Sequence, residues 1–206
     1  MPALTVEQVI GEALALHGGE TLLVHGAGGI TGGLIVQLAA LRGVDVLATA
    51  GPRSADRVRG YGAREVFDYR DPTWPQHAKT LADGHIDAVA NAARGGADMA
   101  MTALADGGQL ATITPDPPVS TRGISVTAVY IGSDGAQLDR LTGLLDAHRL
   151  HIPTPRSYGL VQAASALGQV VAGHEPSGAV IAPTLTGVAA HIGRWRRDDT
   201  VKKEPL

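Results

Sequence analysis

The chain has 206 residues, a net charge of −3 and no cysteine. The lack of cysteine excludes disulfides, thiolate zinc sites and a cysteine nucleophile. The weak negative net charge gives no sign of the excess of basic residues that binds nucleic acid or an anionic membrane. No apolar run is long enough to span a bilayer, and the N-terminus lacks the basic start of a secretory signal. We therefore expect a cytoplasmic protein.

Short apolar runs alternate with segments of helical periodicity along most of the chain. The first predicted element is a helix over residues 5–17, with Thr5 as its N-cap and Gly18-Gly19 at its end. The strands predicted after it are 21–25, 44–50, 65–69, 86–92, 108–113 and 123–131. The helices predicted between and after them are 30–43, 54–62, 73–83, 96–106 and 134–150. Continuous apolar strands bounded by helices indicate an α/β fold with a doubly wound (Rossmann) parallel sheet.

The segment GAGGITGG, residues 26–33, lies directly between a predicted strand and a predicted helix. In the register Ala27-x-Gly29-x-x-Gly32 it matches the dinucleotide-binding fingerprint, with alanine at the first position. The first small residue allows a tight turn, the second lets the backbone approach a pyrophosphate, and the third lets helix and strand pack closely. The helix N-terminus would offer N–H groups to the phosphates. The alternative is a compact turn in a non-binding α/β fold.

The end of the second predicted strand indicates which dinucleotide would bind. NAD sites usually place Asp or Glu there for the ribose 2′-hydroxyl, whereas NADP sites use a nearby Arg. No acid occupies Ala48 to Pro52, Arg53 follows at once, and Arg57 lies about one helical turn further on. The pattern favours NADP(H), unless both arginines are simply solvated helix residues.

After residue 150 the pattern changes to a Pro-punctuated extended stretch, an apolar-striped helix and a short strand. We expect residues 1–150 to form the dinucleotide-binding domain with its N-terminal helix. Residues 151–183 would form a closing strand–helix–strand segment, a small C-terminal α/β appendage. The charged tail, 184–206, is expected to be poorly packed. Its basic run could suggest an anionic partner, but nearby acidic residues offset it, so we expect a solvated tail.

Several motifs, taken in order, give the chain a family resemblance. It resembles the medium-chain dehydrogenase/reductase superfamily, and most closely the zinc-independent quinone oxidoreductase and enoyl reductase branch. The resemblance runs from about Leu4 to Pro183, and it is carried by VHGAGGITGGLIVQLAALRGVDVLATAG, YGAREVFDYRD, IDAVANAARGGADMAMTALADGGQLATI and SYGLVQAASALGQVVAGHEPSGAVIAP. It implies an NADP(H)-dependent oxidoreductase that transfers hydride to a small-molecule substrate, a conjugated carbonyl or a quinone.

The resemblance also implies positions for cofactor contacts. Those against the pyrophosphate would be Ala27, Gly29, Ile30 and Thr31, in a cofactor-binding loop that includes Gly26 and Gly32. Those around the adenosine ribose and its phosphate would be Thr49, Ala50, Arg53 and Tyr69. Those along the path to the nicotinamide would be Asn91, Ala92 and Thr114, with Val129 and Tyr130 at the strand end beside the nicotinamide.

The chain departs from this pattern in ways that affect function. Relatives begin with a GroES-like catalytic domain, and this chain starts after it, so the resemblance implies that half of the substrate cleft is missing. We therefore expect a homo-oligomer, or a partner chain that completes the cleft. In addition, Gly178-Ala179 stands where relatives usually have Gly-Lys, and relatives generally stop near Pro183.

Other chemistry has little support in the sequence. The eight histidines are dispersed, and zinc needs three or four convergent ligands, so we expect no metal site. His25 is interpreted as a structural or supporting residue of the glycine loop. No GxSxG motif indicates a hydrolase. Tyr130 is the one phenol that could donate a proton near a nicotinamide, although a packing role is the commoner use of tyrosine.

Two further classes of function stay open. The chain could be a non-redox enzyme, such as an isomerase or a cyclase, or a nucleotide-binding regulatory protein that reuses the domain, since a fold does not fix a function. It could also be a fragment or decayed relative that binds the cofactor without turnover.

Overall fold

The computed structural model describes residues 2–173 and 178–182 of the chain. The chain divides into two compact units, Met1–Ile152 and Pro153–Leu206.

The first unit is built on a six-stranded sheet in which every pairing is parallel. The strands are β1 (Thr21–His25), β2 (Asp45–Ala50), β3 (Glu65–Asp68), β4 (Ala88–Asn91), β5 (Gln109–Thr112) and β6 (Ser125–Ala128). Their order across the sheet is β3-β2-β1-β4-β5-β6, the dinucleotide-binding arrangement whose direction of winding reverses between β1 and β4. The predicted doubly wound Rossmann fold is confirmed.

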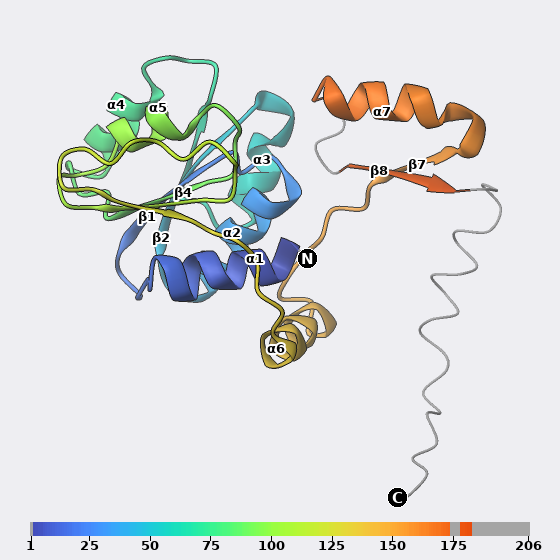
Figure 1. Cartoon of the computed structure of the whole chain (residues 1–206), viewed down its shortest axis with the longest axis horizontal. Helices are drawn as coiled ribbons and strands as arrows, with labels where there is room; N and C mark the ends of the chain where they lie inside the picture. Colours follow the sequence, from blue (N-terminus) through green and yellow to red (C-terminus); the bar gives the residue numbers. More distant parts are fainter. Residues whose placement is uncertain (1, 174–177, 183–206) are drawn as a thin grey trace, which may run out of the picture. The chain divides into compact units, whose positions relative to one another are not determined.

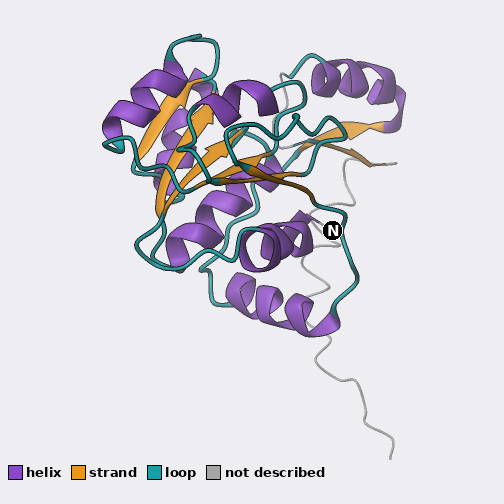
Figure 2. Cartoon of the chain, turned by 60° about the vertical axis from the view of Figure 1, so that its left-hand side comes forward, coloured by secondary structure: helices purple, strands orange, loops and turns teal. Residues whose placement is uncertain are grey.

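Helices pack on both faces of this sheet (Figures 1 and 2). One face is covered by α1 (Pro2–Gln8), η1 (Val9–Ala13), α2 (Ile30–Leu41), α3 (Pro52–Gly60) and α6 (Gly135–Asp146). The other face is covered by α4 (Trp74–Leu81) and α5 (Ala97–Thr102). Successive strand residues point to opposite faces, so Leu22 and Val24 enter the first core while Leu23 enters the second. This explains why β1 is apolar at consecutive positions.

The first helix differs from the prediction at both ends. It begins at Pro2, so Thr5 lies inside the helix and is not its N-cap. Proline is tolerated there because the first-turn N–H groups have no helical partner. The helical segment ends with the π-helix η1 at Ala13, and Ala15 already has a positive φ of 45°, so Gly18-Gly19 lies beyond the end.

Most of the remaining elements fall within the predicted ranges and are shorter, but α3, predicted over 54–62, begins two residues earlier at Pro52. The strand predicted over 123–131 is confined to β6, and the helix predicted over 134–150 ends at Asp146. At its start, the Asp134 side chain accepts a hydrogen bond from the Gln137 N–H at 2.9 Å. After its end, His148 has a φ of 55°, a conformation that a helix does not allow.

The second unit contains β7 (Arg156–Gly159), η2 (Leu160–Gln162), α7 (Ala163–Val171) and β8 (Ala179–Ala182). Its two strands pair in parallel, so a strand–helix–strand unit follows residue 152. The expected charged tail, 184–206, lies outside the described residues. Within the described part of the chain, no helix combines the length and the apolar character that crossing a bilayer requires.

Candidate dinucleotide site

The glycine loop joins β1 to α2 at the point where the strand order reverses. Gly26 has a φ of +87°, a left-handed conformation that glycine adopts without strain. A Cβ on Gly32 would collide with the carbonyl oxygen of Gly26, so glycine is needed for α2 to pack this closely on β1. At Gly29, an added Cβ would be in ordinary van der Waals contact with the carbonyl oxygen of Gly26, at 3.8 Å, so this residue is less crowded than Gly32. The loop therefore fits the close approach of a pyrophosphate.

The N-terminus of α2 faces the same loop. Gly29 is its N-cap, and no side-chain hydrogen bond caps this end. Because the first N–H groups of a helix lack intrahelical partners, those of Ile30 and Thr31 are available to an anion. Both residues are half-buried, whereas Gly32 is buried.

Ala27 lies within the turn where the sequence predicted it. The N–H of Gly29 donates to the carbonyl oxygen of Gly26 at 3.3 Å, so Ala27 and Gly28 are the central residues of this turn, and Gly26 before them has the positive φ. Ala27 is completely buried, and its N–H donates to the carbonyl oxygen of Thr49 at 2.9 Å. Its backbone donor is therefore already used within the protein.

Thr49, predicted at the adenosine end, lies beneath the loop. It is fully buried, and its Oγ1 accepts a hydrogen bond from the N–H of Gly26 at 3.1 Å. The same oxygen lies 2.8 Å from Nδ1 of His25. Together with the bond to Ala27, these contacts pin two consecutive loop residues to the end of β2. The neighbouring Ala50 is buried as well.

His25, at the end of β1, completes this support. Its side chain is buried, and burial lowers the pKa of the imidazole to about 4. The low pKa means that the ring is neutral at pH 7, and its tautomer decides whether Nδ1 accepts from the Thr49 hydroxyl or donates to it. A Cβ on Gly96 would collide with the other ring nitrogen, so the ring fills the space that this glycine leaves.

Cationic and aromatic side chains gather near the carboxyl end of β2. Arg53 is exposed in the first turn of α3, and Tyr69 is half-exposed, its ring 3.3 Å from where a Cβ on Gly51 would lie. The Arg70 guanidinium lies over the Tyr69 ring, 5.2 Å from its centre. Sequence reasoning did not include Arg70, although it directly follows Tyr69 in the same motif.

Arg57 is closer to the glycine loop than Arg53, the residue favoured by the sequence. Its Nη2 donates to the carbonyl oxygen of Gly28 at 2.8 Å. The side chain is half-buried, unlike that of Arg53. The helical spacing placed both arginines on one face of α3, but it gave no sign of the contact with Gly28.

A polar network closes the carboxyl ends of β4 and β5. Asn91 is 1% exposed, and its Nδ2 donates to Oγ1 of Thr112 at 3.0 Å and to Oγ1 of Thr114 at 3.1 Å. Its Oδ1 accepts the N–H of Ala93 at 3.2 Å. Asn91 and Thr114 were predicted site residues, while Thr112 was missed. The half-buried Ala92 borders this network and donates its N–H to the carbonyl of His25.

Val129 and Tyr130 follow the end of β6. The N–H of Val129 donates to the carbonyl of Thr112 at 2.9 Å, which holds this half-buried residue beside β5. Tyr130 is 86% exposed. Within the described residues, no hydrogen bond orients its hydroxyl, so the fold does not position it as a proton donor.

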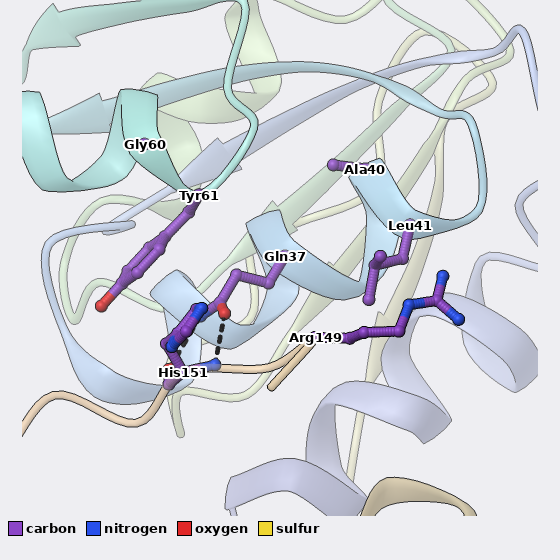
Figure 3. A pocket seen from close by; sticks show the side chains of 7 residues that line it. All are labelled: Gln37, Ala40, Leu41, Gly60, Tyr61, Arg149 and His151. Carbon is purple, nitrogen blue, oxygen red and sulfur yellow. Dashed lines mark hydrogen bonds between the residues drawn. The ribbon is translucent and has the colours of Figure 1, made fainter. Parts of the chain in front are cut away.

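A pocket of about 270 Å³ lies elsewhere on the first unit (Figure 3). It is lined by Gln37, Ala40, Leu41, Gly60, Tyr61, Arg149 and His151. None of the predicted cofactor residues is among them. Gln37 donates to the carbonyl of His151 at 3.0 Å and accepts its N–H at 2.7 Å, so this region anchors the chain after α6 to α2.

Comparisons with known proteins bear on the family of the chain. The sequence model of the family described as "Zinc-binding dehydrogenase" matches residues 61–178. The trans-enoyl reductase ACTTS2 of Alternaria alternata is 34% identical over 135 residues, which cover 61% of this chain and 39% of that protein. The match therefore spans less than half of that relative's length.

Two solved structures share the fold. An NAD-dependent alcohol dehydrogenase has a TM-score of 0.79 and 22% identity, over 89% of this chain and 57% of that chain. A mycobacterial protein complexed with NADPH has a TM-score of 0.78 and 22% identity, over 89% of this chain and 62% of that chain. At these identities the likeness shows the fold alone.

Proposed function

Because the chain belongs to the zinc-binding dehydrogenase family, within the medium-chain dehydrogenase/reductase superfamily, we propose that it is an NADP(H)-dependent oxidoreductase. The substrate class would be a conjugated carbonyl or a quinone. The observation that carries this proposal is the glycine loop at the switch point between β1 and β4, followed by a helix end that no side chain caps. The trans-enoyl reductase relative supports a reducible conjugated substrate.

The choice of NADP(H) over NAD(H) rests on charge. No carboxylate occupies the end of β2 from Ala48 to Pro52, where it would bind a ribose 2′-hydroxyl. Arg53 is exposed beside that strand end and could pair with a 2′-phosphate. One solved neighbour is NAD-dependent and another is an NADPH complex, so similarity supports either dinucleotide.

Zinc, which the family's description names, does not fit the residues present. The chain has no cysteine, and residues 2–173 and 178–182 contain no group of three or more His, Asp or Glu side chains that could hold a metal ion. Zinc sites in proteins need three or four such ligands. The proposal therefore contains no step through zinc.

When bound, the reduced nicotinamide would supply the hydride. The residues of this chain would orient it: Ile30 and Thr31 would donate backbone N–H groups to the phosphates. Asn91, tied to Thr112 and Thr114, would give a fixed polar wall on the nicotinamide side. Tyr130 stays a candidate proton donor that would have to be ordered by substrate, by a second copy or by a partner chain.

Two measurements test the proposal. Titration of the full chain with NADPH and NADH, followed by cofactor fluorescence, should show binding, with NADPH the tighter ligand. Failure of both to bind up to millimolar concentration would overturn the proposal. The absorbance of NADPH should then fall when quinones or enones are added. Binding without consumption of NADPH would instead favour a non-redox enzyme or a nucleotide-binding regulatory protein.

A further inference from the structure

The guanidinium of Arg57 joins α3 to the glycine loop. Its Nη2 lies 2.8 Å from the carbonyl oxygen of Gly28 and 3.3 Å from Oγ of Ser54. The same guanidinium lies over the ring of Tyr61, 5.9 Å from its centre. Arg57 is therefore held from two sides while it donates to the loop.

The loop and α3 are in close contact at this point. A Cβ on Gly28 would lie 3.3 Å from both Cβ and Oγ of Ser54, which is itself buried. A side chain at position 28 would therefore press on α3. With glycine there, the carbonyl of Gly28 comes within reach of Arg57.

The other two arginines of α3 have different surroundings. Arg59 pairs with Asp56 at 3.3 Å and with Glu65 at 3.1 Å, both away from the loop. Arg53 is exposed, and no ion pair or hydrogen bond joins it to the described residues. No carboxylate of the described residues pairs with Arg57 either, so the Gly28 carbonyl does not compete with an ion pair for its donors.

We propose that Arg57 is a positioning residue, which braces Gly28 and thereby holds the glycine loop ready for the dinucleotide. The inference rests on the proposed function and adds a residue to it. A charge-assisted hydrogen bond to a carbonyl is stronger than a neutral one. Glycine-rich backbone loses much conformational freedom on ordering, so a brace that orders it beforehand favours binding.

The Arg57–Gly28 brace would affect dinucleotide affinity differently from a residue that recognises the 2′-phosphate. NADPH and NADH carry the same pyrophosphate, and the loop would contact that part of either dinucleotide. Loss of the brace should therefore weaken both by a similar factor. A residue that recognises only the 2′-phosphate would affect NADPH alone.

The test uses the full chain with Arg57→Met, which keeps an apolar stem and removes the donors. Arg57→Lys keeps the charge and one donor group, and Arg59→Met on the same helix is the matched control. We expect Arg57→Met to raise the Kd of both NADPH and NADH roughly tenfold, Arg57→Lys to restore part of both, and Arg59→Met to change neither. Thermal melts of each variant separate loss of affinity from loss of the fold.

A second readout needs no cofactor. Amide hydrogen exchange at Gly28, Gly29 and Ile30 should be faster in Arg57→Met than in the unchanged chain, and unaltered in Arg59→Met. Unaltered exchange in Arg57→Met, or weakening of NADPH alone, would overturn the brace. Failure of the unchanged chain to bind either dinucleotide would instead overturn the proposed function. The hydrogen-exchange result would still decide whether Arg57 orders the loop.

Discussion

The imidazole of His25 stacks on the indole of Trp74, with ring centres 5.1 Å apart and planes 13° apart. Trp74 belongs to the core on the α4–α5 face of the sheet. At the edge of the ring, Nδ1 of His25 contacts the hydroxyl of Thr49, which accepts the N–H of Gly26. One buried ring thus connects a hydrophobic core to the turn of the glycine loop.

This arrangement predicts a loss of stability in mild acid. The pKa of His25 is about 4 in the folded chain, against an ordinary value of 6.5, so the unfolded chain binds more protons between these values. The free energy of unfolding should therefore fall as pH drops from about 6.5 to about 4, by up to about 3 kcal/mol from this residue. Denaturant unfolding of the full chain across this pH range measures it.

The control for the acid effect is His25→Gln, which does not titrate. Its stability should change less over the same pH range, because the His25 contribution is removed. Glu65, whose pKa lies below its ordinary value of 4.5, should lose its stabilising contribution only at more acidic pH in both chains. Equal slopes for the two chains between pH 6.5 and 4.5 would contradict the assignment to His25.

Substitution Gly32→Ala should damage both fold and binding. The added Cβ would meet the backbone of Gly26 and Ala27, which cannot move aside as a side chain can. We expect a loss of about 1–3 kcal/mol in stability and a clear loss of affinity for NADPH. Gly143→Ala, in α6 with no atom within 4 Å of the added Cβ, is the control and should be neutral or slightly stabilising. Equal melting temperatures for the two variants would refute the tight-packing argument.

Arg53→Ala should change cofactor preference without changing the loop. Loss of its charge should weaken NADPH about tenfold and leave NADH nearly unaffected, as expected for a charge-assisted contact to a 2′-phosphate. The ratio of the two dissociation constants is the measurement. Equal weakening of both dinucleotides would count against the assignment of Arg53 to the phosphate.

Asn91→Leu should be strongly destabilising. The change keeps a similar volume but leaves the N–H of Ala93 without its acceptor. It also removes the amide donor from the hydroxyls of Thr112 and Thr114, which keep their bond to each other. Removing one partner from a buried polar network typically loses about 1–3 kcal/mol. Thermal unfolding checks the stability, and NADPH titration checks whether the polar wall also contributes to binding. A melting temperature equal to that of the unchanged chain would show that the network contributes little.

The exposed apolar side chains of the second unit lead us to expect self-association of the chain. Several apolar side chains of η2 and α7 are exposed in the described structure, among them Leu160, Val161, Leu167 and Val171. Apolar groups gathered in this way often mark an interface. Light scattering should report more than one copy per particle, and the double variant Val161→Glu with Leu167→Glu should shift the mass toward the monomer. A monomer for the unchanged chain at working concentration would exclude this interface.

Much of the fold was accessible from local sequence patterns. Apolar runs, helical periodicity and glycine stops depend on neighbouring residues, and they predicted the alternation of strands and helices and the place of the glycine loop. The same local reasoning was wrong at the first helix. Threonine is a favoured N-cap residue, which pointed to Thr5, but proline is also common in the first turn of a helix, as at Pro2. Propensity alone does not decide at which of the two the helix begins.

The amino-acid sequence by itself determined a doubly wound α/β chain with a dinucleotide loop and no acid at the end of β2. Only the tertiary structure decided which side chains meet there. The parallel register of β4 and β5 places Asn91 opposite Thr112. Thr49 is buried beneath the glycine loop, and the packing of α3 brings Arg57 to the carbonyl of Gly28. These contacts join residues about 20 to 30 positions apart, and they depend on strand register and helix packing, which local patterns do not encode.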